Sequence, residues 1–159
     1  MENNKQYSVL VNGVIAKAGK ILISRRSFQE KHQPGSWTIP GGKVENGPDS
    51  DEVFNIVEKT LVKEIREEVG IEISTNIRLI ANNTFRHSEG HIVLALVFLC
   101  EFKSGNAQAL EDTIDTVWIT PQQLNEYEFA PNVRDYIAKG FALLPFMAKY
   151  KKNSSELDK

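Results

Sequence analysis

The spacing of hydrophobic and polar residues along the chain predicts several strands with one long helix among them. Residues 7–26, YSVLVNGVIAKAGKILISRR, form two strand-like runs joined by a turn near Gly19. Residues 71–87 read as one long strand. The apolar run over residues 91–105 reads as another, hydrophobic enough to lie at the centre of a sheet. A further short strand is expected over residues 116–119.

A helical pattern occupies residues 50–69. Apolar residues recur there at every fourth position, which is the spacing of one face of an α-helix: Val53, Val57, Leu61, Ile65 and Val69. Ser50 stands where an N-cap residue is expected, and Gly70 directly follows the last apolar position, as a terminating glycine does. We therefore expect one helix from about residue 50 to residue 69.

The C-terminal part of the chain predicts two further helices. Pro121 opens a short one, because proline suits the first helical position. A last helix is expected over residues 131–150, interrupted near Gly140 or Pro145, and residues 151–159 are expected to form a flexible tail. Strands, a long helix, more strands and terminal helices, in that order, predict an α+β fold in which helices flank a mixed β-sheet.

Length and composition agree with a single domain over residues 1–159. Hydrophobic residues make up 41% and charged residues 25%, as in globular proteins. The 19 basic and 21 acidic residues leave a net charge of −2, which argues against binding of polymeric nucleic acid but allows an anion the size of a nucleotide. Cys100 is the single cysteine, so we expect a core residue and no internal disulfide.

The N-terminal residues lack the basic and then apolar pattern of a signal peptide. The longest apolar run, residues 92–100, is far too short to cross a bilayer. We therefore expect a cytoplasmic protein without membrane contact.

Three glutamates, Glu64, Glu67 and Glu68, crowd the end of the predicted helix. At about 100° per residue, Glu64 and Glu68 fall within the arc of the apolar stripe, and Glu67 lies roughly 40° outside it. Buried carboxylates need protons, cationic partners or a metal. Two interpretations stay open: a helix face with salt bridges such as Lys63–Glu67, or a site for Mg²⁺ or Mn²⁺, which prefer oxygen ligands.

A glycine pair, Gly41–Gly42, lies in the segment PGGKVENG after the short apolar piece WTIP. Adjacent glycines permit positive φ and close approach of the backbone to another group. By itself such a pair is usually a turn. Together with the glutamates, it could bring backbone groups to a site for a metal and a phosphate.

These two elements together resemble the Nudix hydrolases, whose box reads G-x5-E-x7-R-E-U-x-E-E-x-G-U, with U a bulky aliphatic residue. The segment KEIREEVGI, residues 63–71, matches the second half except for Lys63 at the arginine position. The box region covers residues 41–71, and the wider resemblance spans roughly residues 7–140. Seven extra residues separate the two halves. Because seven residues are close to two helical turns, we expect an insertion within the helix that keeps its faces in phase.

The first glutamate of the box has no counterpart, because the aligned position is Pro48 when counted from Gly42 and Asn55 when counted back from Lys63. In the family, the arginine and this glutamate mainly orient the metal-binding glutamates. Lysine does not replace arginine where a two-pronged contact is needed.

The resemblance implies an α/β/α sandwich and hydrolysis of the diphosphate linkage in a nucleoside diphosphate linked to another group, such as a nucleoside triphosphate. The cofactor would be Mg²⁺ or Mn²⁺, and a homodimer would be in keeping with the family. The implied metal ligands are the Gly41 carbonyl, Glu64, Glu67, Glu68 and an acid from a later loop. Glu64 is also implied as a general base. For the later acid we prefer Glu111 over Asp112 and Asp115, and a solvated acidic loop is the alternative.

Two residues are candidates for substrate binding. Arg25 and Arg26 end a strand and point to opposite faces, so we choose Arg26 for a phosphate contact, with an exposed surface arginine as the alternative. Asn132 resembles a base-contacting residue of the family, although helix capping explains an asparagine there as well. The three histidines have no metal-like spacing and receive no role: His32, His87 and His91.

The resemblance also leaves a second function open. A Nudix fold that binds a nucleotide or metabolite without hydrolysing it, as a sensor or interaction module, would tolerate the altered box.

Overall fold

The N-terminal pattern forms the two strands that it predicts. In the computed structural model, which describes residues 6–47 and 51–157, β1 (Tyr7–Lys17) pairs antiparallel with β2 (Lys20–Arg26). Gly19 joins them with a φ of 77°, a left-handed conformation that glycine adopts without steric cost.

The central strand is β7 (Ile92–Gly105), as its apolar run predicted. It runs parallel to β1 on one side and antiparallel to β6 (Arg78–Arg86) and β5 (Ile71–Ile73). The single strand predicted over residues 71–87 is therefore wrong, because the chain leaves the pairing with β7 at residues 74–77 and rejoins it in a shifted register.

Three shorter strands complete the mixed sheet. β3 (Trp37–Thr38) and β8 (Thr113–Ile119) pair with β2, and β4 (Gly41–Lys43) pairs with β1. The pairing of β4 with β1 matters for the site, because it sets the glycine pair beside the middle of β1.

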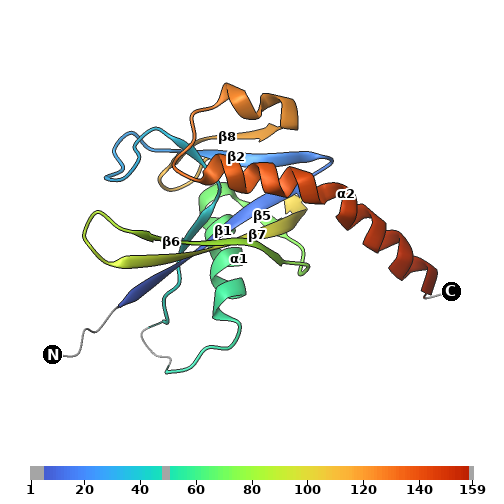
Figure 1. Ribbon diagram of the computed structural model, residues 1–159, viewed down its shortest axis with the longest axis horizontal. Coiled ribbons are helices and arrows are strands. Elements are labelled where there is room, and N and C mark those ends of the chain that lie inside the picture. Colours follow the sequence, from blue (N-terminus) through green and yellow to red (C-terminus); the bar gives the residue numbers. More distant parts are fainter. Residues whose placement is uncertain (1–5, 48–50, 158–159) are drawn as a thin grey trace.

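Helices cover both faces of this sheet, as Figure 1 shows. On one face, α1 (Ile56–Val69) packs its apolar stripe against alternate residues of β1 and β7, among them Ile15 and Cys100. On the other face, α2 (Val133–Leu157) packs against intervening residues such as Val14 and Leu99. Both faces of the central strands are buried, which explains why their sequence is almost continuously hydrophobic.

Cys100 lies in the core as predicted. Its side chain is fully buried, and burial raises the pKa of its thiol to about 12. The thiol is therefore protonated and unreactive at neutral pH.

The start of α1 differs from the prediction. The helix begins at Ile56, because Asn55 takes a left-handed backbone conformation (φ 55°) that a helix interior excludes. Phe54 precedes it with 71% of its surface exposed, and Ser50 lies outside the described residues. The seven positions that separate the first glutamate of the box from its arginine are filled here by residues 56–62, all of which lie in α1. The extra residues therefore precede the helix, and the predicted insertion within it is wrong.

The first of the C-terminal helices agrees with the prediction, and α2 differs from it in two respects. Pro121 opens a 3-10 helix, η1 (Pro121–Glu126), as predicted, with a reciprocal Thr120–Gln123 cap. The predicted interruption of α2 is wrong, because Gly140 and Pro145 both lie inside a continuous helix. This helix runs on to Leu157, through most of the segment that was expected to be a flexible tail. Among the described residues, no helix combines the length and the hydrophobicity needed to cross a membrane.

Gly140 packs tightly against β1, and this contact yields a stability prediction. A Cβ atom added at Gly140 would lie 2.6 Å from Cγ1 of Val14. Glycine to alanine in a helix normally stabilises by about 1 kcal/mol, but overpacking a core costs about 1–3 kcal/mol. We expect Gly140→Ala to lower the free energy of unfolding in urea, and Val14→Ala combined with it to recover part of that loss. A more stable Gly140→Ala protein would contradict the tight contact.

Candidate active site

The last two turns of α1 place Glu64 and Glu68 against the glycine pair of β4. The backbone N–H of Gly41 donates a hydrogen bond to Oε2 of Glu68 at 3.2 Å. A Cβ atom on Gly42 would overlap the carboxyl group of Glu64. The predicted close approach of the Gly-Gly backbone to the glutamates is present. Glycine is required at Gly41, because a Cβ atom there would collide with the backbone carbonyl oxygen of Val11.

Glu67 lies at the edge of this cluster, as the helical wheel predicted. Its Oε1 is 3.9 Å from Nζ of Lys63, and 38% of its side chain is exposed. Arg66 points elsewhere and forms a two-pronged ion pair with Glu72, at 2.6 and 2.9 Å. Across residues 6–47 and 51–157, the three glutamates do not form a group in which one carboxylate oxygen from each lies within 4.8 Å of the others.

Partial burial raises the pKa values of two of these carboxylates, Glu64 and Glu68. The pKa of Glu68 rises to about 8, mainly because the group is buried, although the Gly41 N–H opposes the rise. The nearby Glu64 and Glu111 raise it further. Burial and the charge of Glu67 also raise the pKa of Glu64. When ionised, these two carboxylates therefore carry more negative charge than their surroundings stabilise.

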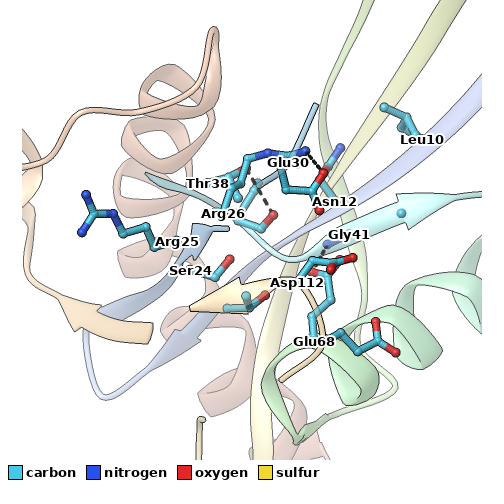
Figure 2. A pocket seen from close by; sticks show the side chains of 14 residues that line it. Leu10, Asn12, Ser24, Arg25, Arg26, Glu30, Thr38, Gly41, Glu68 and Asp112 are labelled. Atoms are coloured by element: carbon cyan, nitrogen blue, oxygen red, sulfur yellow. Dashed lines mark hydrogen bonds and ion pairs between the residues drawn. The ribbon is translucent and has the colours of Figure 1, made fainter. Parts of the chain in front are cut away.

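A pocket opens beside Glu68 (Figure 2). Its walls come from β1, β2, β3, β4 and the loop before β8. The lining residues include Asn12, Ser24, Arg26, Thr38, Gly41 and Glu111. Carboxylates and a guanidinium thus share one cavity, which suits an ion and an anionic ligand together.

Arg25 and Arg26 both line the pocket, and Arg26 is the one whose charge acts on Glu68. The Nη2 of Arg26 pairs with Oε2 of Glu30 at 3.1 Å, and its Nε donates to the His32 carbonyl at 2.9 Å. Arg25 instead points away from Glu68 (Figure 2) and lies over the Phe28 ring at 4.9 Å. Arg26 is held in place by the 27–36 loop while its charge reaches the pocket, where it lowers the pKa of Glu68 against the effect of burial.

The loop after β7 carries Glu111 to the site. The backbone N–H of Leu110 donates to the Glu68 carbonyl at 3.0 Å, and that of Ser27 donates to the Asp112 carbonyl at 2.9 Å. These bonds fix the loop between the end of α1 and the end of β2. Glu111 and Asp112 both line the pocket. Asp115 is outside its lining among the described residues and accepts a hydrogen bond from the Thr116 N–H.

Asn132 is placed differently from the other candidates. In the described part of the chain, it is outside the pocket lining and directly precedes α2. Its carbonyl accepts a hydrogen bond from the Tyr136 N–H at 3.2 Å. Asn132 therefore lies at the N-terminal boundary of α2, where the capping alternative would place it, and this contact is made by its backbone carbonyl.

Sequence reasoning missed several polar residues of the pocket. Asn12 and Ser24 interrupt otherwise apolar strands, and Ser24 is only 1% exposed. Polar residues at such positions are the signal that could have identified them, because a strand buried on both faces rarely keeps one without a reason. Glu30, the partner of Arg26, carried no comparable signal.

Known proteins match both the sequence and the fold. A family model of the NUDIX domain matches residues 4–140. The CTP pyrophosphohydrolase of Escherichia coli (strain K12) is 33% identical over 122 residues, which are 77% of this chain and 82% of that protein. The ADP-ribose pyrophosphatase of Methanocaldococcus jannaschii is 29% identical over 135 residues, 82% of this chain and 73% of that protein.

Among solved structures, the solution structure of the E. coli ORF135 protein superimposes with a TM-score of 0.66 at 31% identity, covering 87% of this chain and 91% of that one. The predicted mixed sheet with flanking helices is confirmed by this likeness. The match over residues 4–140 and the shared fold show that the chain belongs to the NUDIX domain family.

Proposed function

We propose that this protein uses Glu64, Glu67 and Glu68 with a divalent cation to cleave the diphosphate linkage of a nucleoside triphosphate or a related nucleotide. The predicted class of enzyme is confirmed at the level of the family, because its relatives are named as nucleotide pyrophosphohydrolases and pyrophosphatases. The observation that carries the proposal is the pair of partly buried glutamates against Gly41–Gly42, whose pKa values are both raised.

The residues present fit Mg²⁺ or Mn²⁺. All candidate ligands are hard oxygen donors, and the buried negative charge needs a cation. Glu64, Glu68 and the Gly41 carbonyl would hold the ion, with Glu67 and Glu111 at the margin of the site. When bound, such an ion would neutralise charge on the diphosphate and polarise the phosphorus that water attacks.

The side chains of the chain itself supply positioning and proton transfer. Arg26 lines the pocket and is fixed by Glu30 and the His32 carbonyl, so its guanidinium is suited to orient a phosphate group. Glu64 is the group that we propose to accept a proton from the attacking water. Asn132 as a base contact stays a prediction, as do a homodimer and a cytoplasmic location.

A panel assay tests the reaction directly. We expect hydrolysis of at least one member of a set of nucleoside triphosphates, ADP-ribose, dinucleoside polyphosphates and nucleotide sugars, dependent on added Mg²⁺ or Mn²⁺ and measured as release of phosphate or nucleotide. Binding of a nucleotide without turnover under these conditions would instead favour the non-hydrolytic module.

Glu68→Gln tests the ligand assignment. The amide keeps the size of the side chain but removes its charge, so we expect turnover to fall by at least about a hundredfold, since even groups that only orient metal ligands are worth about 10–100-fold. Glu58→Gln in the first turn of the same helix is the matched control, because Glu58 is exposed. An unchanged rate in Glu68→Gln would disprove its role.

The raised pKa of Glu68 predicts a pH-dependent stability of the metal-free protein. With a folded-state pKa of about 8 against an ordinary value of 4.5, the folded state binds more protons than the unfolded state between these pH values. Stability should therefore fall as the pH rises from about 5 to about 8. We expect this slope in urea unfolding with a chelator, and expect Glu68→Gln or added Mg²⁺ to flatten it. A slope unchanged by Glu68→Gln would refute the assignment.

A further inference from the structure

All three histidines of the chain lie together, away from the glutamate cluster. His87 directly follows β6 and His91 directly precedes β7, so they flank the turn of the β6–β7 hairpin. Their rings are stacked, with 4.6 Å between centroids. The ring of His32, from the 27–36 loop, meets His87 edge-on at 4.4 Å. Widely separated parts of the chain therefore bring these imidazoles to one place.

The hairpin turn also directs a carboxylate to this place. The His87 N–H bonds to the His91 carbonyl at 2.9 Å, and the Gly90 N–H bonds to the His87 carbonyl at 2.8 Å, which closes the turn. Glu89 at its tip has one carboxylate oxygen 2.9 Å from Nζ of Lys31 and the other 4.0 Å from Nδ1 of His87. The ligand atoms of His87, Glu89 and His91 all lie within 4.8 Å of one another.

We propose that His87, Glu89 and His91 form a second metal site, for a transition-metal ion of the Zn²⁺ type. Two imidazoles with one carboxylate are a ligand set that Zn²⁺ accepts, whereas Mg²⁺ prefers a set made only of oxygens. The two sites on this protein would therefore select different metals. His32 meets His87 edge-on but lies outside the group whose ligand atoms are within 4.8 Å of one another, so the proposed ligands are His87, Glu89 and His91.

The site would fasten the hairpin to a wall of the pocket. Lys31 and His32 belong to the loop that touches the hairpin, and the carbonyl of His32 accepts the hydrogen bond from Nε of Arg26. An ion held by the hairpin next to His32 would restrict this loop, and with it Arg26 and Glu30. Figure 1 shows the loop between β2 and β3 and the β6–β7 hairpin on the same side of the molecule.

The competing explanation is that the cluster is only a packed turn. Nδ1 of His87 accepts a hydrogen bond from the Glu89 N–H at 3.3 Å, and the rings stack on one another, so the turn is also stable without an ion. The two explanations differ in whether the histidines bind metal at one ion per chain.

Calorimetric titration of Zn²⁺ into the untagged full chain, with Mg²⁺ in large excess to occupy the oxygen site, separates them. We expect one Zn²⁺ per chain, and at least about a hundredfold weaker binding in His87→Gln/His91→Gln. Asp135→Asn, an exposed acid at the start of α2, is the control and should bind as the unaltered chain does. Absence of stoichiometric binding, or unchanged binding in the double variant, would overturn the proposal.

Two further measurements guard against misinterpretation. Because the chain has only three histidines, their imidazole nitrogen resonances can be assigned singly, and those of His87 and His91 should shift on Zn²⁺ addition. Glu89→Gln, at an exposed position, should weaken binding at least tenfold without a change in the circular dichroism spectrum. Zn²⁺ binding that is lost in Glu68→Gln but kept in Glu89→Gln would place the ion at the glutamates and refute the second site.

Discussion

The close approach of α1 to the glycine pair of β4 is the contact on which the site depends. Gly42 leaves the space that the Glu64 carboxyl group occupies, and Gly41 donates its N–H to Glu68 at a position where a Cβ atom would collide with the backbone of β1. This geometry buries carboxylates that water would otherwise stabilise. The resulting free-energy cost is tolerable where a cation can neutralise the charge, and it explains why negative charge is concentrated on the packing side of a helix.

The sheet makes this approach possible because both of its faces are covered. β1 and β7 lie at its centre and alternate their side chains between α1 and α2, so Ile15 supports one helix and Val14 the other. Leu61, Ile65 and Val69 pack into the core and so fix the rotation of α1 about its own axis, which sets the direction of its other side chains. Glu64 and Glu68 follow from that packing, since they neighbour these apolar positions along the helix.

The helix face could be predicted from the sequence because periodicity reports which side packs, and the stripe from Leu61 to Val69 is regular. The beginning of the helix could not. Val53 continues the four-residue spacing, but Asn55 turns the backbone into the left-handed region, which spacing does not reveal. The break at residues 74–77 was missed for a similar reason: both halves of the segment have the same strand character, and the register shift depends on their common partner β7.

Site residues brought by loops were harder to predict than those on α1. Glu111 could only be chosen through the resemblance, because its place depends on backbone bonds such as that between Leu110 and Glu68. Asn132 was also chosen through the resemblance, but an asparagine is equally common just before a helix, and this one directly precedes α2. The histidines received no role from the sequence, although His87, Glu89 and His91 stand within five residues and their ligand atoms meet across the β6–β7 turn. The approach of His32 comes from a distant loop, which spacing along the chain does not reveal.

The two departures from the family box bear differently on the site. The seven extra residues precede α1, so they leave the spacing from Lys63 to Gly70 unchanged and do not disturb the glutamates. Lys63 is a change within the helix itself. It is exposed and its nearest acidic partner is Glu67, so its charge acts at the edge of the cluster and only partly offsets the raised pKa of Glu64. The position of the buried carboxylates therefore depends on the glycine pair and the core, and much less on the residue that replaces the arginine.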